Sequence, residues 1–543
     1  MSADQGDGFR PFFHDVQLGE SVIRILEAFL AGRAAIAAAL VVAMVWGFWS
    51  PPLYDLDEGA FSEATREMMV SGNYASIFLN AEPRHDKPIL IYWLQAASAH
   101  LFGLNEFALR LPSVLAGLAW VSALFAFTRR HLDAATAGVA AMLLTLSLFV
   151  GLIAKAAVAD ALLNLFLVLA LFDIYSHFRH PSRYLLLRVF VWLGLGFLTK
   201  GPVAVVFPVI VSGLLYLGDG RWREWLRLAF DPTGLLLFVA IVLPWHIAVY
   251  LDSGWAFFEG FYLHHNLARY GNAMEGHSGG VFYYALVAPL LLMPFSGWFL
   301  NTLGNWRVAL RDPLDRFVWL WFFSVLLVFS FSGTKLPHYM LYGITGAVLL
   351  MARYRDRLRN AWLGFLPPLI FLGVLSVLPQ LFAYLARTTG RDYDRGLFEA
   401  GAQAFSGWPQ WLSIVAMALA VIFVSLPLTV WRRLLLIGFA QAALVAGVIV
   451  PTVLDVLQAG PKAAGLFAAE QGKDVVSYRV YQPSVSVYRQ QVITHAPAVP
   501  GQWVYVRSDH VAEFLAQPSP YHKHIVFSQP PATLIAIDAQ AAD

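Results

Sequence analysis

Three acidic residues stand close together near the start of the chain, where an apolar run ends. They are Asp55, Asp57 and Glu58. A second ionisable group follows at residues 84–87, which read Arg-His-Asp-Lys. A pair of carboxylates can supply a general base and a group that orients it. Ionisable side chains beside hydrocarbon are costly and tend to mark functional sites, so the setting of these residues decides how they are interpreted.

The composition indicates a membrane setting. Of the 543 residues, 58% are hydrophobic and 13% are charged, whereas soluble domains average about 45–50% apolar and about 25% charged residues. We therefore predict a polytopic α-helical membrane protein. The formal net charge of +2 gives no reason to expect a nucleic-acid partner. The absence of cysteine excludes disulfides, thiol nucleophiles and cysteine-ligated metals.

Apolar segments long enough to cross a bilayer recur along the chain. A span needs roughly 17–25 mostly apolar residues, and this criterion predicts about 13 transmembrane helices. Residues 1–24 show no cleavable signal pattern, so we expect the first span to act as the targeting signal. The segments are 29–49, 110–128, 134–153, 161–178, 184–199, 202–218, 235–251, 281–301, 317–331, 339–352, 361–385, 411–430 and 434–454.

One apolar segment, 88–104, is ambiguous. It carries Gln95, Ser98 and His100, so by itself it could span the bilayer or lie in the interface. Cytoplasmic loops carry excess Lys and Arg. If this segment does not cross, all the dense basic clusters fall on the same side as the N-terminus. We therefore predict a juxtamembrane helix within a loop formed by residues 50–109.

The last part of the chain changes character. Residues 456–543 contain strand-like alternations of polar and apolar residues, punctuated by Pro and Gly. We expect a membrane domain over residues 1–455 and a small C-terminal α/β domain over residues 456–543. In a bacterial inner membrane, this domain and the loop 50–109 would face the periplasm.

Polar residues at span ends gather on that same face. The positive-inside tendency depletes Lys and Arg there, yet Lys200 and Lys335 stand nearly alone in short loops. Loop ends carry charges in any case, but this distribution favours one shared site. Lys and Arg can hold a phosphate or diphosphate, and a site at the membrane surface suits a lipid-linked phosphate. The residues are Asp55, Asp57, Glu58, Arg84, His85, Asp86, Lys87, Lys155, Asp160, Lys200, Arg269, Lys335, His338 and Tyr339.

The same residues leave metal binding open and argue against a nucleotide. Glu58, His85 and Asp86 could ligate a divalent metal, although their spacing matches no tight metal motif. The chain contains neither a Gly-x-x-x-x-Gly-Lys-Ser/Thr loop nor a Gly-x-Gly-x-x-Gly turn after a strand. We therefore expect no nucleotide site, and no cofactor is certain.

Five motifs occur in order along the chain. They are residues 57–68 (Asp-Glu-Gly-Ala-Phe-Ser-Glu-Ala-Thr-Arg-Glu-Met), 86–93 (which begin Asp-Lys-Pro and end Tyr-Trp), 155–160 (Lys-Ala-Ala-Val-Ala-Asp), 197–202 (Phe-Leu-Thr-Lys-Gly-Pro) and 335–339 (Lys-Leu-Pro-His-Tyr). As an ordered set they resemble the GT-C membrane glycosyltransferases. The resemblance is closest to the branch that holds the lipid A aminoarabinose transferase and the protein O-mannosyltransferases. The C-terminal third resembles this branch only in layout.

The resemblance implies a GT-C fold and an inverting glycosyltransferase. Such an enzyme moves a sugar from a polyprenyl-phosphate donor to lipid A or another envelope glycolipid on the periplasmic face. The resemblance implies that Asp57 is the first-loop catalytic acid, with Glu58 beside it and Asp160 as second-loop partner. The substrate-binding residues that it implies, mainly for the carrier phosphate, are His85, Asp86, Lys87, Lys200, Arg269, Lys335 and Tyr339.

Two departures from the family pattern leave the sugar and the acceptor open. His85 stands where we expect an aromatic residue, and His265-Asn266 replaces an expected Glu-His pair. One alternative is a protein O-mannosyltransferase-like enzyme with a Ser/Thr acceptor. Another is a transporter or flippase for a lipid-linked substrate, which would place charges near the bilayer midplane and use internal repeats. A scaffold protein would not explain the ordered lysines and acids.

Overall fold

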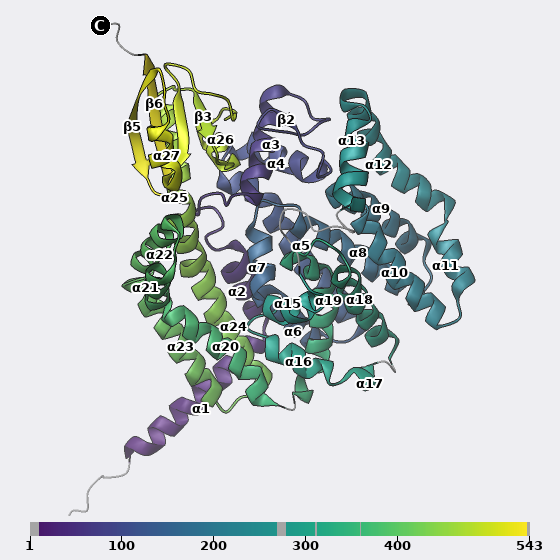
Figure 1. Ribbon diagram of the computed structural model, residues 1–543. Coiled ribbons are helices and arrows are strands. Elements are labelled where there is room, and N and C mark those ends of the chain that lie inside the picture. The colour runs from purple at the N-terminus through teal and green to yellow at the C-terminus, as the bar shows by residue number, and fades with distance from the viewer. Residues whose placement is uncertain (1–9, 269–278, 310–311, 359, 540–543) are drawn as a thin grey trace, which may run out of the picture.

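The computed structural model describes residues 10–268, 279–309, 312–358 and 360–539. Helices form most of it, and a small sheet stands at one end of the helical body (Figure 1). The apolar segments of the sequence are helical over most of their length. The helices that cover them are α1 (Arg10–Ala31), α2 (Arg33–Leu40), η1 (Val41–Val45), α5 (Glu106–His131), α6 (Ala134–Leu146), α7 (Leu148–Lys155), α8 (Asp160–Arg179), α9 (Arg183–Lys200), α10 (Val203–Gly218), α12 (Pro232–Ser253), α15 (Tyr283–Leu291), α16 (Ser296–Leu303), α18 (Pro313–Ser330), α19 (Leu341–Arg353), α20 (Ala361–Ser376), α21 (Leu378–Thr388), α23 (Trp408–Ser425), α24 (Val430–Leu444), η5 (Val445–Ile449) and α25 (Val450–Glu470).

Shorter helices connect these segments or lie outside them. They are α11 (Trp222–Ala229), α13 (Ala256–Phe258), η2 (Glu259–Ala268), α17 (Trp306–Ala309), η3 (Pro337–Met340), η4 (Arg355–Arg357) and α22 (Asp392–Ala404).

The chain is a polytopic helical membrane protein. Among the described residues, 6 helices are long and apolar enough to cross a bilayer, and the number reaches 9 if each of three bent pairs is one span. The pairs bend by 73°, 67° and 66° at short breaks. The expected total of about 13 also includes helices shorter than a regular span, such as α10 and α19, and it stays a prediction.

Two helices precede the second predicted span and pack against each other. These are α3 (Asp57–Ser71) and α4 (Leu90–Phe102), joined by a hairpin of β1 (Phe78–Leu79) and β2 (Glu82–Pro83). With 13 residues and a rise of 1.5 Å per residue, α4 is about 20 Å long, which is less than the hydrocarbon thickness of about 30 Å. This length fits the predicted juxtamembrane helix, whose depth in the bilayer stays a prediction.

The C-terminal part contains a small mixed sheet, as the sequence predicts. Its four strands lie in the order β3-β4-β6-β5, with β3 and β4 parallel and the other pairs antiparallel. Helix α25 runs on from the membrane part and packs against this sheet, so the expected boundary at residue 456 falls inside a helix. The elements are β3 (Val475–Tyr478), α26 (Pro483–Arg489), β4 (Trp503–Arg507), η6 (Ser508–His510), α27 (Val511–Ala516), β5 (Tyr521–Gln529) and β6 (Ala532–Ala539).

Helix α26 packs against α3, which lies at the same end of the molecule, and so connects this domain to the first loop (Figure 1). The Ser484 backbone N–H donates to Asp55 Oδ1 at 3.0 Å, and the Ser484 hydroxyl also donates to the Asp55 carboxylate. The Tyr488 hydroxyl donates to Glu106 Oε1 at 2.9 Å and accepts the Leu53 backbone N–H at 2.8 Å. The first loop and the C-terminal domain therefore hold each other in place.

A buried ion pair fixes the first loop from the other side. Arg110 Nε and Nη2 donate to the two Glu58 oxygens at 2.8 and 2.7 Å. The same carboxylate accepts the backbone N–H groups of Tyr54 at 3.0 Å and Ala157 at 2.7 Å. Arg110 also donates to three backbone carbonyls within residues 48–52. One pair thus joins the end of the first membrane helix, α3, α5 and the loop before α8.

Replacing Arg110 by Met should strongly destabilise the protein, because Glu58 would stay buried without its partner. Breaking a buried pair in this way costs about 3–5 kcal/mol. Thermal unfolding in detergent, followed by tryptophan fluorescence, should show a clear fall in Tm. Arg24→Met is the matched control, because Arg24 pairs with Glu20 on an exposed helix surface. Equal Tm values for R110M and R24M would contradict this role.

The docking of the C-terminal domain should weaken as the pH rises from about 4 to about 7. Burial raises the pKa of Asp55 from 3.8 to about 7, even though Ser484 hydrogen bonds oppose the change. An acid with a raised folded pKa contributes stability that is complete below its unfolded pKa and is lost as the pH rises through the folded pKa. The Tm of the wild type should therefore fall as the pH increases from about 4 to about 7.

The variant Asp55→Asn should lose this part of the pH dependence, because an amide does not titrate. Asp509→Asn is the control. The hydrogen bond from Arg507 holds the pKa of Asp509 below its usual range, so this acid does not titrate near neutrality. D509N should keep the wild-type fall in Tm over the same pH window. An unchanged fall in D55N would show that another group is responsible.

Candidate functional site

Asp57 and Glu58 begin α3 but have different settings. Asp57 is exposed, and an acid in the first turn of a helix interacts favourably with the helix dipole. Each oxygen of buried Glu58 accepts one hydrogen bond from Arg110 and one from a backbone N–H. Burial raises the pKa of Glu58, but Arg110 and these hydrogen bonds outweigh it and hold the pKa below its usual range. Glu58 therefore helps to hold the first loop in position, and its expected catalytic role stays a prediction.

Residues 84–87 form a compact ionic cluster. Arg84 donates from Nε and Nη2 to both Asp86 oxygens at 2.6 and 3.1 Å, and Lys87 Nζ donates to Asp86 Oδ2 at 3.1 Å. Burial raises the pKa of Asp86, but Lys87 and Arg84 outweigh it and hold the pKa well below its usual range. An ammonium has three N–H donors, so Asp86 orients Lys87 and leaves donors for another anion.

His85 faces the loop that follows α12. Its ring lies edge-on to Phe257 of α13, with the ring centroids 5.9 Å apart. A side chain at Gly260 in η2 would come within 2.7 Å of His85 Cβ. His85 therefore packs the 84–87 cluster against this loop.

Asp160 begins α8 and joins residues from three other elements. Lys200 Nζ donates to Asp160 Oδ1 at 2.6 Å, and the Tyr342 hydroxyl donates to the same oxygen at 2.8 Å. His338 Nε2 lies 3.8 Å from this oxygen. The second-loop acid, the Thr-Lys-Gly motif and the Lys-Leu-Pro-His-Tyr motif therefore meet at one carboxylate.

The local sequence explains the place of Lys200. Helix α9 ends there because Gly201 adopts φ +75°, a conformation that favours glycine. A side chain at Gly201 would also come within 2.4 Å of the Phe261 ring. Lys200 thus stands in the last turn of a helix, where a positive charge interacts favourably with the helix dipole.

His338 connects this group with the first loop. Burial lowers the pKa of His338 to about 4, while Asp160 and Asp57 act to raise it and Lys200 and Lys87 act to lower it. The 3.8 Å approach of His338 to Asp160 makes it part of the Asp160 group, and the influence of Asp57 and Lys87 on its pKa connects it electrostatically with the first loop. At neutral pH His338 is uncharged, so one of its ring nitrogens can accept a proton or a hydrogen bond.

Lys335 and Tyr339, the other residues of the 335–339 motif that we expect in the site, have different surroundings. Buried Lys335 donates from Nζ to three backbone carbonyls within residues 329–332, at 2.8–3.3 Å. These bonds fill the three donors of an ammonium, so Lys335 caps α18, and its geometry does not support the expected contact with substrate. The Tyr339 ring lies beside Lys200, with Nζ 5.5 Å from the ring centroid. Tyr339 can therefore help to position Lys200.

Arg269 lies outside the described residues, which reach Ala268 at the end of η2. Its expected contact with a carrier phosphate remains a prediction. The expected metal ligands Glu58, His85 and Asp86 do not form a joint group in the structure. Both carboxylates already bind Arg or Lys side chains, and His85 packs against an aromatic ring.

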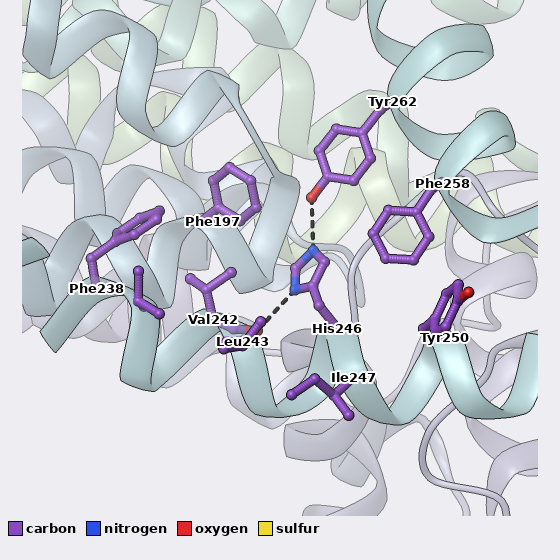
Figure 2. Close-up of a pocket in the computed structure, with 10 residues that line it drawn as sticks. Phe197, Phe238, Val242, Leu243, His246, Ile247, Tyr250, Phe258 and Tyr262 are labelled. Atoms are coloured by element: carbon purple, nitrogen blue, oxygen red, sulfur yellow. Dashed lines mark hydrogen bonds between the residues drawn. The ribbon is translucent and has the colours of Figure 1, made fainter. Parts of the chain in front are cut away.

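An apolar groove of about 410 Å³ opens one helical turn from Lys200, between α9, α12 and the segment after α12 (Figure 2). Phe197 forms one wall. His246, the polar residue of α12 at its centre, makes hydrogen bonds with the Val242 carbonyl at 2.8 Å and the Tyr262 hydroxyl at 2.7 Å. Its polar atoms are thus satisfied within the protein, so the groove suits hydrocarbon. The exposed lining residues of α12 are Val239, Leu243, Ile247 and Tyr250.

Arg110 and Tyr342 are the site residues for which we made no prediction. Arg110 stands at the start of an expected span, and an arginine there calls for a buried acid as partner. That signal could have paired it with an acid of the first loop. Tyr342 lies inside an apolar segment and carries no charge, so its sequence context gives no comparable signal.

Comparisons with known proteins confirm the family resemblance of the sequence. Residues 86–247 match the family described as dolichyl-phosphate-mannose-protein mannosyltransferase. The chain is 30% identical over 377 residues to the undecaprenyl phosphate-alpha-4-amino-4-deoxy-L-arabinose arabinosyl transferase of Aeromonas hydrophila, covering 66% of this chain and 67% of that protein. It is 29% identical over 478 residues to transferase 1 of the same name from Pseudomonas fluorescens, covering 82% of each.

The fold is similar to that of a solved structure. The crystal structure of ArnT from Cupriavidus metallidurans bound to undecaprenyl phosphate aligns with a TM-score of 0.73 and 20% identity. The alignment covers 92% of this chain and 97% of that chain. The chain therefore belongs to the family of membrane glycosyltransferases that contains the undecaprenyl phosphate-alpha-4-amino-4-deoxy-L-arabinose arabinosyl transferases.

Proposed function

We propose that this chain transfers 4-amino-4-deoxy-L-arabinose from an undecaprenyl phosphate donor to lipid A or a related envelope glycolipid. The activity named for its relatives supports the donor and its sugar. The observation that carries the proposal is the ion pair of Lys200 and Asp160, in which Lys200 stands three residues along α9 from Phe197, a wall of the apolar groove. A lipid-linked phosphate suits both features, because its phosphate can bind the ammonium groups and its hydrocarbon chain can bind the apolar groove.

Lys87 and Lys200 are the groups that would hold the carrier phosphate. Each has a carboxylate partner that orients its ammonium, Asp86 for Lys87 and Asp160 for Lys200. As the bond between sugar and phosphate breaks, negative charge grows on the leaving phosphate. Oriented ammonium groups stabilise that charge without reorganising. By family resemblance, Arg269 would add a third cation.

Asp57 is the group that would face the acceptor. An acceptor oxygen attacks the anomeric carbon from the side opposite the phosphate, so the new C–O bond forms as the sugar–phosphate bond breaks, and undecaprenyl phosphate leaves. If the acceptor is a hydroxyl, Asp57 takes its proton. If it is a phosphate of lipid A, little base catalysis is needed and Asp57 mainly orients the acceptor.

The groove beside Lys200 would hold the first isoprene units of the carrier. Its exposed side chains lie on α12, part of a segment long and apolar enough to span the bilayer, so the carrier can enter from lipid. Contact of isoprene units with these side chains removes little polar surface, because His246 keeps its hydrogen bonds to protein.

The proposed layout in the membrane follows from the same site. We place about 13 helices in a bacterial inner membrane and the site at the periplasmic surface.

A Ser/Thr acceptor on a protein is the second candidate, because the family matched by residues 86–247 is described as a protein mannosyltransferase. A transporter function has less support, because transporters bind their substrates near the bilayer midplane between internal repeats, whereas we place this site at the periplasmic surface.

Asp57→Asn should abolish transfer and leave the fold intact, because asparagine keeps the size of the side chain and loses its charge. The purified protein in detergent is incubated with radiolabelled undecaprenyl phosphate-aminoarabinose and lipid A, and the labelled glycolipid is separated by chromatography. Loss of the group that deprotonates a hydroxyl acceptor, or that orients a phosphate acceptor, costs about 100-fold or more in rate. Asp509→Asn, a change on the C-terminal domain, is the control and should retain wild-type activity.

Each other outcome of this assay has a definite meaning. Full activity in D57N removes Asp57 from the mechanism. Transfer of the label to a Ser/Thr peptide, and not to lipid A, would show that the acceptor is a protein. If the wild-type protein transfers no sugar from any polyprenyl-phosphate donor, the result contradicts the proposal and favours the transporter.

Leu243→Trp should narrow the apolar groove and weaken binding of long carriers. A loss of about 1.4 kcal/mol of apolar contact raises the KM of the undecaprenyl donor about tenfold. A donor analogue with a methyl group in place of the isoprenoid chain should be affected much less, because it does not reach the groove. Leu236→Trp is the matched control, because Leu236 is exposed on the same helix but does not line the groove. Equal KM changes for both donors would show that the groove does not hold the carrier.

A further inference from the structure

We propose that the C-terminal sheet, at the end where β5 begins and β6 ends, binds a divalent transition-metal ion through His522, His524 and Asp538. These residues lie on β5 and β6, apart from the cluster assigned to sugar transfer. Among the residues that the structure describes, they form a group of three metal-ligating side chains whose ligand atoms all lie within 4.8 Å of one another.

The register of the two strands brings the three side chains together. His522 pairs with Asp538 across the antiparallel ladder, and His524 pairs with Ala536. Side chains two positions apart on a strand share a face, as do directly opposed residues. His524 Nδ1 lies 3.1 Å from Asp538 Oδ2, and the centroids of the two imidazole rings are 5.7 Å apart.

The surroundings leave room for an ion. The methyl side chain of Ala536, opposite His524, is too small to fill the space between the ligands. Lys523 stands between the two histidines in sequence but points to the other face, where its Nζ donates to the carbonyls of Phe514 and Gln517 at 2.8 and 2.9 Å. The lysine charge is therefore held away from the three ligands.

The donor set indicates which ions would bind. Two imidazoles and a carboxylate suit Zn²⁺, Ni²⁺ or Cu²⁺, whereas Mg²⁺ and Ca²⁺ prefer oxygen ligands alone. Ligand atoms of a tetrahedral Zn²⁺ site lie about 3.3 Å apart. Small side-chain rotations reach this spacing, because His524 and Asp538 are 46% and 53% exposed. Three protein ligands leave one coordination position for water.

The proposed ion would cross-link β5 and β6 of the sheet. Strand β5 is an edge strand, bonded only to β6 in the sheet order. An ion that bridges β5 to β6 binds the folded sheet and not the unfolded chain, so it stabilises the folded state by mass action.

Calorimetric titration with Zn²⁺ tests this site directly. The full chain is purified in detergent without a polyhistidine tag, stripped with a chelator and titrated with zinc chloride, with magnesium chloride as the contrast. We expect saturable Zn²⁺ binding at one ion per chain and no Mg²⁺ binding. Loss of one ligand, in His522→Ala or His524→Ala, should weaken Zn²⁺ binding at least tenfold. His495→Ala should not, because His495 bonds to Ser477 elsewhere in the domain.

A second measurement separates ion binding from folding. The metal-free Tm of each variant should equal that of the wild type, and Zn²⁺ should raise the Tm of the wild type and of H495A only. Absence of saturable Zn²⁺ binding to the wild type would overturn the proposal. So would wild-type Zn²⁺ affinity in the double variant that lacks both His522 and His524.

Discussion

The buried ion pair between Glu58 and Arg110 is the constraint on which the rest of the site depends. A buried carboxylate is stable only when its acceptor positions are filled, and here Arg110 and two backbone N–H groups fill them. One of these N–H groups belongs to Ala157, three residues before Asp160, and Glu58 itself follows Asp57. The pair therefore sets how the two acids of the site lie relative to each other, although it takes no part in the proposed chemistry.

The same physical rule shapes the cationic side of the site. A lysine near hydrocarbon needs a charged partner, and Asp86 and Asp160 provide it for Lys87 and Lys200. Each partner uses part of the lysine's donor capacity, so the ammonium groups are oriented and still able to bind an anion. His338 lies 3.8 Å from Asp160 and is neutral because its burial lowers its pKa to about 4.

The sequence predicts the helices well because long apolar runs have few alternatives in a membrane. It predicts the meeting of Asp160, Lys200 and the 335–339 motif through motif order. It does not predict which groups fill the acceptor positions of Glu58 and the donors of Lys335, because these hydrogen-bond partners are contributed by the folded chain. The sequence pattern does not predict strand β6, since residues 532–537 are buried on both faces and lack polar–apolar alternation. The predicted domain boundary falls inside α25, since the helix continues beyond the membrane segment.

The anomeric configuration of the transferred sugar is the most direct test of the proposed geometry. If Lys87 and Lys200 hold the carrier phosphate and the acceptor binds on the side of Asp57, as we propose, transfer takes place in a single displacement. The product of the purified protein can be isolated and its anomeric proton and carbon examined by NMR. The proposal predicts a configuration inverted relative to that of the donor. A retained configuration would require two displacements and would contradict the proposed arrangement of donor, acid and acceptor.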